Sequence, residues 1–262
     1  MKPLVFLFTD FGAEGPYLGQ MEAVLRVLSP TTPVINLLSN APRTQPQPSG
    51  LLLAALVSQL PPQAIVLAIV DPGVGGSRKP LVLEADGRWY LGPDNGILNG
   101  VAAEAHQVTW KEILWRPERL SNSFHGRDLY APVAARLAEG DFAWPHRALA
   151  APEVSAWVSE LPEVIYVDHY GNLITGLRYR AERAGSVLSV GGIAVQQALT
   201  FCAVPEGQLF WYENSMGLIE VAANCRSAAD LLPGSGVGAP IGILQAVSEQ
   251  SAPMEGDCSP VS

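Results

Sequence analysis

Apolar residues in the first half of the chain form either unbroken runs or helically spaced stripes. The runs Leu4–Phe8 and Ala64–Val70 are continuous, which is typical of strands buried on both faces of a sheet, and Val34–Leu38 is a further apolar run. Apolar positions three or four residues apart predict a helix over Tyr17–Leu28. Ser49 has the character of an N-cap and predicts a second helix over Leu51–Leu60. This alternation of strands and helices predicts an α/β N-terminal domain with a mainly parallel sheet.

The second half has a different pattern, in which short apolar runs are separated by turn residues, mostly glycine. The predicted strands are Val164–Val167, Val187–Val190, Ile193–Val195, Gln208–Trp211 and Ile219–Ala222. Such closely spaced strands indicate a small antiparallel, β-barrel-like C-terminal domain. We therefore expect an α/β domain over residues 1–155, a β-barrel domain over residues 160–247 and a flexible tail over residues 248–262.

Composition narrows the class of protein. Hydrophobic residues make up 48% of the chain and charged residues 16%, which excludes intrinsic disorder. The net charge of −9 argues against nucleic acid as a partner. The apolar runs are too short to span a bilayer, and no leader peptide is recognised at the N-terminus. Three cysteines without metal-ligand spacing favour a reducing compartment, so we expect a cytoplasmic protein without membrane partners.

Two acids stand where predicted strands end. Asp10 follows the first apolar run and Asp71 follows the third, and a glycine-containing loop comes after each. Open parallel sheets bind ligands at the carboxyl ends of their strands, although an aspartate beside glycine or proline is also a common turn residue. The Asp71–Arg78 segment is rich in glycine but has neither the Walker A spacing nor a GxGxxG fingerprint.

Further polar motifs lie in predicted loops. His125 stands between Phe124 and Gly126-Arg127-Asp128, where its neighbours can hold it as an acid–base group. In the β-rich half, Asp168–Asn172 and Asn214–Gly217 are either turn formers or ligand contacts. The aromatic run Phe210–Tyr212 is either a flat face for a planar ligand or the edge of a core.

Taken in order, these segments resemble one family. The motifs are Thr9-Asp10-Phe11-Gly12, Val70–Gly75 with Arg78, Pro93–Gly96, Phe124–Asp128, Asp168 with Gly171-Asn172, and Asn214–Gly217. Together they resemble the S-adenosylmethionine hydrolase (hydroxide adenosyltransferase) family, which is related to the S-adenosylmethionine-dependent fluorinase and chlorinase. The resemblance extends from about residue 5 to about residue 245.

The resemblance implies cleavage of S-adenosylmethionine to adenosine and methionine, without a metal or other cofactor. It also implies a homotrimer, in which the substrate lies between the N-terminal domain of one subunit and the C-terminal domain of the next. Matched to the family motifs, Asp71, Arg78 and His125 position and activate water, and Asp10 holds the ribose hydroxyls. The remaining expected substrate contacts are Tyr17, Asp168, Asn172, Ser215 and Ala223.

Three other functions stay open from the sequence. A halide-using adenosyltransferase would share the fold and the substrate, but would need a halide pocket where Asp71 stands. A metal-dependent phosphohydrolase could be built from Asp10, Asp71, Asp94, His125 and Asp128, because Mg²⁺ prefers carboxylate ligands. A non-catalytic nucleoside-binding protein would bind adenosine without turnover.

Overall fold

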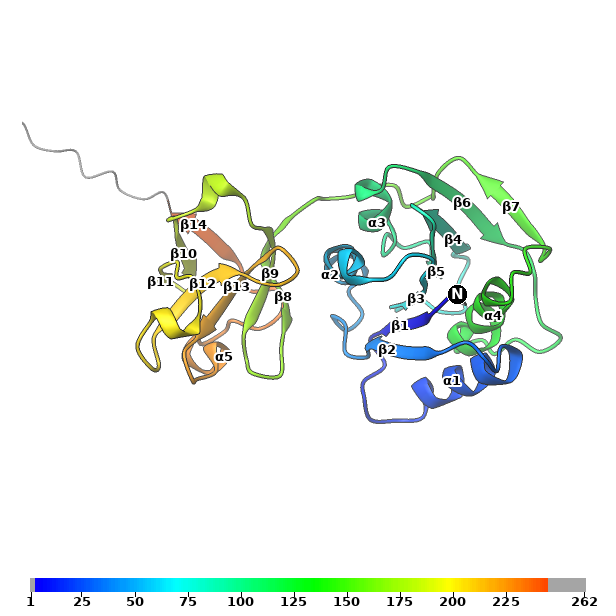
Figure 1. Ribbon diagram of the computed structural model, residues 1–262, viewed down its shortest axis with the longest axis horizontal. Helices are drawn as coiled ribbons and strands as arrows, with labels where there is room; N and C mark the ends of the chain where they lie inside the picture. The colour runs from blue at the N-terminus through cyan, green and yellow to red at the C-terminus, as the bar shows by residue number, and fades with distance from the viewer. Residues whose placement is uncertain (1–2, 245–262) are drawn as a thin grey trace, which may run out of the picture.

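The computed structural model describes residues 3–244, and Figure 1 shows their arrangement. The N-terminal part is built on a seven-stranded sheet with the order β2-β1-β3-β5-β4-β6-β7. Its strands are β1 (Val5–Thr9), β2 (Val34–Leu38), β3 (Ile65–Ile69), β4 (Pro80–Ala85), β5 (Arg88–Pro93), β6 (Val108–Ile113) and β7 (His146–Leu149). The three apolar runs therefore become strands, as predicted, and they lie side by side.

The sheet is mixed rather than mainly parallel, which corrects the prediction. Strands β2, β1, β3 and β5 run parallel, whereas β4 and β6 pair antiparallel with their neighbours and β7 pairs antiparallel with β6. The antiparallel half includes the tight β4–β5 hairpin around Asp86-Gly87. Its strands carry charged residues between apolar ones, so the search for unbroken apolar runs missed them.

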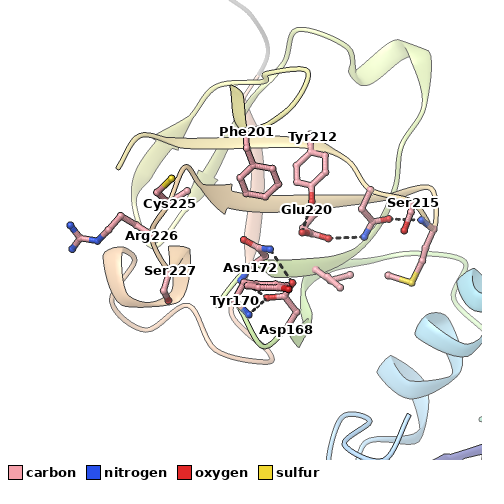
Figure 2. A pocket seen from close by; sticks show the side chains of 14 residues that line it. Asp168, Tyr170, Asn172, Phe201, Tyr212, Ser215, Glu220, Cys225, Arg226 and Ser227 are labelled. Carbon is pink, nitrogen blue, oxygen red and sulfur yellow. Dashed lines mark hydrogen bonds between the residues drawn. The ribbon is translucent and has the colours of Figure 1, made fainter. Parts of the chain in front are cut away.

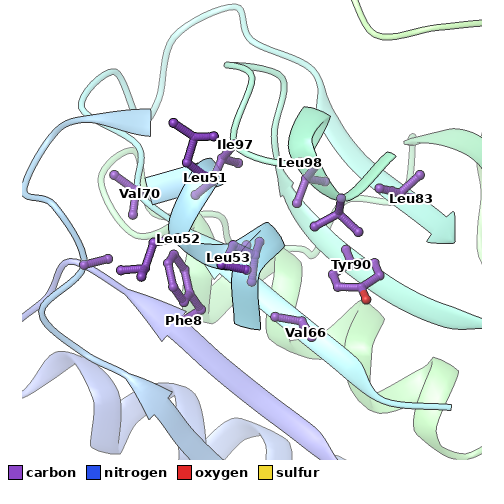
Figure 3. Close-up of a cluster of buried hydrophobic side chains, with 14 of the residues drawn as sticks. Phe8, Leu51, Leu52, Leu53, Val66, Val70, Leu83, Tyr90, Ile97 and Leu98 are labelled. Carbon is purple, nitrogen blue, oxygen red and sulfur yellow. The ribbon is translucent and has the colours of Figure 1, made fainter. Parts of the chain in front are cut away.

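Helices cover both faces of this sheet, and alternate strand residues point to each face. The helices are α1 (Tyr17–Leu28), α2 (Pro46–Leu56), α3 (Asn99–Glu104) and α4 (Ala131–Ala138). Phe6 and Phe8 of β1 pack in one core with α2 and α3, part of which Figure 3 shows. Val5 and Leu7 pack in a second core with α1 and α4.

Helix α2 is apolar on every side, and its residues from Pro48 to Ala55 are all buried. It lies between the N-terminal sheet and the C-terminal part (Figure 1), because Ile165, Ile174 and Leu218 of the C-terminal sheet belong to the same core. This explains a helix without a polar face. The helix begins earlier than predicted. Ser49 is not an N-cap but is buried inside α2, where its hydroxyl donates to the Pro42 carbonyl oxygen.

The C-terminal part contains two antiparallel sheets, with the orders β12-β13-β9-β8 and β11-β10-β14. The strands are β8 (Leu161–Val167), β9 (Leu173–Arg178), β10 (Val187–Val190), β11 (Ile193–Val195), β12 (Leu209–Glu213), β13 (Leu218–Ala223) and β14 (Ile241–Leu244), and a short helix α5 (Ala228–Leu231) follows β13. Both sheets contribute to one apolar core that includes Leu188 and Trp211. The antiparallel β architecture is confirmed, but residues 3–244 do not form a closed barrel.

The predicted domain limits at residues 155 and 160 stay predictions. They coincide with an irregular segment between β7 and β8 that joins the two parts in Figure 1. The predicted tail over residues 248–262, with Cys258, lies outside the described residues.

Candidate active site

The N-terminal sheet has a topological switch point between β1 and β3. Strand β1 pairs with β2 on one side and with β3 on the other, and Thr9 lies opposite Ile69. Helix α1, which follows β1, and helix α2, which precedes β3, pack on opposite faces of the sheet. Such a point opens a crevice at the carboxyl ends of the strands. Asp10 follows β1 directly and Asp71 follows β3 by one residue, so both acids reach this crevice.

The crevice holds a cavity of about 400 Å³. Its lining includes Asp10, Phe11, Tyr17, Gln20, Asp71, Phe124, His125, Arg127 and Tyr130. Phe11, Tyr17 and Phe124 contact one another with ring centroids 5.4–5.8 Å apart, and Tyr17 meets Phe124 edge-on at 90°. The cavity therefore joins an aromatic wall to a set of carboxylate and imidazole groups, a combination typical of small-molecule sites.

Asp71 is held by Arg78, seven residues along the glycine-rich loop. The Arg78 guanidinium donates to Asp71 Oδ1 from Nη2 at 2.7 Å and from Nε at 3.1 Å, and the Gly73 amide donates to the same oxygen at 3.3 Å. The Asp71 side chain is only 8% exposed. This placement of the Arg78 side chain depends on glycine at position 73, since a Cβ there would lie 1.7 Å from Arg78 Nη2. Arg78 itself does not line the cavity and acts on it through Asp71.

His125 lies where the chain enters a π-helical turn, η2 (Gly126–Tyr130), that continues into α4. Pro132 cannot donate a backbone hydrogen bond, so the wider turn before it avoids a broken α-helical repeat. The His125 ring neither donates nor accepts a hydrogen bond with any other group of residues 3–244. Its imidazole is thus available to a ligand in the cavity that it lines.

The neighbours of His125 are fixed more tightly. Arg127 and Asp128 form a two-pronged ion pair, with Nε–Oδ1 at 2.6 Å and Nη2–Oδ2 at 3.0 Å. Arg127 Nη1 also donates to Gln20 Oε1 of α1 at 2.7 Å. The hydrogen bond from Arg127 lowers the pKa of Asp128 below its ordinary value. This pair ties η2 to α1 and holds the segment that carries His125.

The second group of predicted residues lies in the C-terminal part. Asp168, Asn172, Ser215 and Ala223 line a cavity of about 890 Å³ that shares no lining residue with the first. Its other lining residues, several of them labelled in Figure 2, are Tyr170, Ile174, Phe201, Tyr212, Asn214, Met216, Glu220, Cys225, Arg226 and Ser227. The structure therefore brings the predicted site residues together in two sets, not in one.

Asp168 is fixed by the turn that joins β8 to β9. Its Oδ1 accepts from the backbone amides of Tyr170 at 2.9 Å and Asn172 at 2.8 Å, and its Oδ2 accepts from Asn172 Nδ2 at 2.9 Å. Gly171 has a φ of +81° and approaches Ser227 so closely that a Cβ would lie 2.1 Å from its Oγ. The turn-former interpretation of Asp168 is thus correct, and the same turn points the carboxylate at the cavity.

Sequence reasoning missed some lining residues and left the place of others open. Phe210 and Trp211 are fully buried core residues, and of the run Phe210–Tyr212 only Tyr212 lines the cavity. Glu220 was missed because it stands inside an apolar strand run. Its signal is its pairing across the β12–β13 hairpin, where it lies opposite Tyr212.

Two residues of the Pro93–Gly96 motif have structural partners. Asp94 is buried and accepts hydrogen bonds from the amides of Glu153 at 2.8 Å and Val154 at 3.1 Å. Asn95 Nδ2 donates to the Val70 carbonyl oxygen at 2.8 Å. Asn95 of this motif therefore supports the loop around Asp71.

Comparison with known proteins identifies the family. The sequence profile of the SAM hydroxide adenosyltransferase N-terminal domain matches residues 5–145, and that of the C-terminal domain matches residues 162–241. The chain belongs to the SAM hydroxide adenosyltransferase family. The family resemblance predicted from the motifs is confirmed.

Similarity to individual proteins agrees with this. The chain is 38% identical to a protein of Thermus thermophilus named (R)-S-adenosyl-L-methionine hydrolase, over 93% of this chain and all of that protein. A protein of Salinispora arenicola with the same name is 34% identical over 88% of this chain and 94% of its own length. An uncharacterised conserved protein of Thermotoga maritima superimposes with a TM-score of 0.83 at 28% identity, over 92% of this chain and all of that one.

Two properties of the described residues bear on partners. No helix within residues 3–244 is long and apolar enough to cross a membrane. Within the same range, no three His, Cys, Asp or Glu side chains are grouped closely enough to hold a metal ion.

Proposed function

We propose that this protein is an enzyme that hydrolyses S-adenosyl-L-methionine to adenosine and L-methionine. The observation that carries the proposal is that Asp10, Asp71 and His125 line one cavity, in a chain whose relatives are named hydrolases of this compound. In the proposed arrangement Asp10 accepts hydrogen bonds from the ribose hydroxyls and Tyr17 contacts the nucleoside. Asp71 and His125 then lie beside the reacting C5′ carbon, and Arg78 acts there through Asp71.

In the proposed reaction a water oxygen attacks C5′ in line with the bond from C5′ to sulfur. That bond breaks, its electron pair goes to the sulfonium sulfur, and neutral methionine leaves. The water proton passes to the Asp71–His125 pair and then to solvent. Because the sulfonium is already a good leaving group, no acid is needed at sulfur, and positioning supplies much of the rate, up to about 7–11 kcal/mol in the best-oriented cases.

Water is favoured over halide by the charge at the site. Asp71 Oδ2 accepts no hydrogen bond from residues 3–244, whereas Oδ1 accepts three. The free oxygen can accept a proton or a hydrogen bond from water, and it would repel a halide ion. A general base near water contributes about 10²–10⁴ in rate.

The metal-dependent phosphohydrolase is not favoured. It would need Asp94 and Asp128 as metal ligands, but both carboxylates already have partners. Asp94 accepts two backbone amides, and Asp128 is paired with Arg127. We propose that the reaction needs neither a metal nor another cofactor.

We further propose that the active enzyme is a homotrimer whose site is shared between subunits. The supporting observation is that the nucleoside and water residues lie in one cavity, and the residues matched to the methionine and adenine contacts lie in another. In a trimer, Asp168, Asn172, Ser215 and Ala223 of one subunit would face Asp10 and His125 of the next. An arrangement of this kind completes a site that a single chain leaves divided.

Two finer points belong to the same proposal. The relatives' names specify the (R) configuration, and we expect this enzyme to prefer the same epimer at sulfur. We also place it in the cytoplasm, because Cys202 and Cys225 are exposed and form no disulfide within residues 3–244, which suits a reducing compartment.

A product assay tests the function. Purified protein is incubated with S-adenosylmethionine and chloride in ¹⁸O-water containing a chelator, and the products are read by mass spectrometry. Adenosine with ¹⁸O at C5′, together with methionine, is the expected result. A 5′-halo-adenosine would assign a halide adenosyltransferase instead, activity only after metal is restored would assign a metalloenzyme, and bound adenosine without turnover would assign a binding protein. Resolved (R) and (S) epimers in the same assay test the stereochemical preference.

A further inference from the structure

Glu220 is a buried carboxylate in the wall of the C-terminal cavity. Its residue is 5% exposed, and it lies on β13 between the aromatic and polar sides of the cavity (Figure 2). Its Oε1 accepts a hydrogen bond from the Tyr212 hydroxyl at 2.6 Å, and its Oε2 accepts one from Asn214 Nδ2 at 2.9 Å. No Lys, Arg or His within residues 3–244 forms an ion pair with it. Burying a carboxyl group costs free energy unless its oxygens are hydrogen-bonded. Here Tyr212 and Asn214 supply those bonds.

On the polar side, Glu220 determines how the Asn214 amide is oriented. Because Nδ2 of Asn214 donates to Glu220, its Oδ1 faces the backbone and accepts from the amides of Met216 at 2.9 Å and Leu218 at 3.0 Å. These bonds close the turn between β12 and β13. Ser215, which we propose as a contact for the substrate's methionine, lies in that turn.

On the aromatic side, Glu220 fixes the tilt of Tyr212. The two residues face each other across the hairpin, and the Tyr212 ring meets the Phe201 ring at a centroid distance of 5.6 Å and an angle of 68°. Phe201 also lines the cavity. One carboxylate therefore connects the aromatic wall to the turn that carries Ser215.

Both hydrogen bonds reach Glu220 from donors, so its two oxygens act as acceptors in this arrangement. Burial raises the pKa of Glu220, whereas the bonds from Tyr212 and Asn214 act in the opposite direction. Burial is the larger effect, so the pKa of Glu220 stays above its ordinary value.

We propose that Glu220 is a positioning residue that determines how tightly the site holds the amino-acid end of the sulfonium substrate. It acts through Asn214 on the Ser215 turn and does not itself touch the reacting atoms. The inference rests on the proposed function, since it assigns the turn to the part of the substrate that carries the ammonium and carboxylate groups. A nucleoside that lacks this part should be bound independently of Glu220.

The test compares Glu220→Gln with Glu213→Gln, a control on the neighbouring strand whose side chain is exposed and does not line the cavity. In Glu220→Gln one acceptor oxygen remains, and the Tyr212 hydroxyl and the Asn214 amide compete for it. We expect KM for S-adenosylmethionine to rise about tenfold, since hydrogen bonds to charged groups are among the stronger ones. The inhibition constant of adenosine should change less than about twofold, and Glu213→Gln should behave as wild type.

A double variant tests the mechanism of positioning. Combining Asn214→Asp with Glu220→Gln reverses donor and acceptor. The glutamine amide at position 220 then donates to one carboxylate oxygen at position 214, in place of the wild-type bond from Asn214 to Glu220. The second oxygen of that carboxylate still accepts from the turn amides, and the glutamine oxygen still accepts from Tyr212. We expect KM in the double variant to return most of the way to the wild-type value. Asn214→Asp alone places two carboxylates side by side and should have a higher KM than either Glu220→Gln or the double variant.

The outcomes separate this proposal from the proposed function. No turnover of S-adenosylmethionine by the wild type would reject the function itself. With an active wild type, the positioning role is overturned by an unchanged KM in Glu220→Gln, by a parallel loss of adenosine binding, or by no recovery in the double variant. If Glu220→Gln does not fold, Tyr212→Phe removes one of the two hydrogen bonds to Glu220. It should give a smaller rise in KM for S-adenosylmethionine, again without weakening the binding of adenosine.

Discussion

The Arg78 guanidinium donates two hydrogen bonds to a single oxygen of Asp71, from Nη2 at 2.7 Å and from Nε at 3.1 Å to Oδ1. An arginine that only neutralised the acid would more often bridge both oxygens. Here the side-on geometry leaves Oδ2 without a donor among residues 3–244. Arg78 therefore orients the carboxylate and keeps one oxygen available in the cavity.

The first prediction follows from this free oxygen. Asp71→Asn keeps the shape of the side chain but loses the basic oxygen, so kcat should fall by at least about 10²-fold. His125→Ala should lower kcat by a similar factor. Adenosine affinity, measured by calorimetry, should change little in both. Unchanged turnover in both variants would remove this pair from the reaction.

A second prediction concerns the glycine that makes room for Arg78. A Cβ on residue 73 would overlap the guanidinium, with 1.7 Å to Nη2. Gly73→Ala should displace Arg78 and lower kcat about tenfold or more, while the free energy of unfolding changes little because the loop is at the surface. Gly236→Ala is the matched control, since a Cβ there meets nothing within 4 Å. Equal activity of the two variants would show that the Arg78 geometry is not required.

A third prediction assigns Asp10 to the nucleoside. Its Oδ2 accepts the Thr44 amide at 2.9 Å, a bond that the oxygen of an asparagine can still make. Asp10→Asn should therefore keep the loop in place but lose the charged acceptor for the ribose hydroxyls. Because a hydrogen bond to a charged group contributes about 1.5–3 kcal/mol, adenosine affinity should fall about ten- to a hundredfold. Equal binding of adenosine and 2′,3′-dideoxyadenosine by the wild type would contradict this role.

The N-terminal half of the site could be predicted from sequence because its cause is local. Unbroken apolar runs identify the strands, and the carboxyl ends of parallel strands bring Asp10 and Asp71 to one edge. The mixed character of the sheet could not be predicted in this way. Strands β4 and β5 contain Glu84 and Arg88 and are held by hairpin pairing, not by burial of every residue.

The C-terminal half depends on contacts between residues that are distant along the chain. Glu220 reads as a polar interruption of a strand until the hairpin places it opposite Tyr212 and beside Asn214. Likewise Tyr212 lines a cavity while its neighbour Trp211 is core, because successive strand residues face opposite sides. The motif resemblance identified Ser215 and Asn172 without indicating what holds them.

A fourth prediction concerns stability against acid. Glu160 is bound by Arg183, with Nη2–Oε2 at 2.7 Å and Nη1–Oε1 at 2.8 Å, and this lowers the pKa of Glu160 below its ordinary value of 4.5. The stabilisation is therefore present above about pH 4.5 and is lost as the pH falls through the lower pKa of the folded state.

Glu160→Gln should reduce the free energy of unfolding at pH 7 by about 1.5–3 kcal/mol, the contribution of hydrogen bonds to a charged group. The variant should also lose part of the decline in stability between about pH 5 and pH 3. Urea unfolding followed by circular dichroism at several pH values measures both effects. Glu182→Gln, an exposed neighbour of Arg183, is the control, and an identical pH profile for the two variants would exclude a role for the Glu160–Arg183 pair.

The last prediction tests whether the two cavities belong to one site formed by different subunits. Asp71→Asn damages only the first cavity, and Asn172→Ala damages only the second. Each variant alone should be nearly inactive. If the cavities of neighbouring subunits form one site, mixed oligomers contain some sites made of two intact halves, and co-refolding the variants should restore a substantial fraction of wild-type activity. If one chain supplies both halves, every site keeps one defect and mixing restores nothing. Light scattering on the same samples gives the oligomeric state, and an active monomer would contradict a shared site directly.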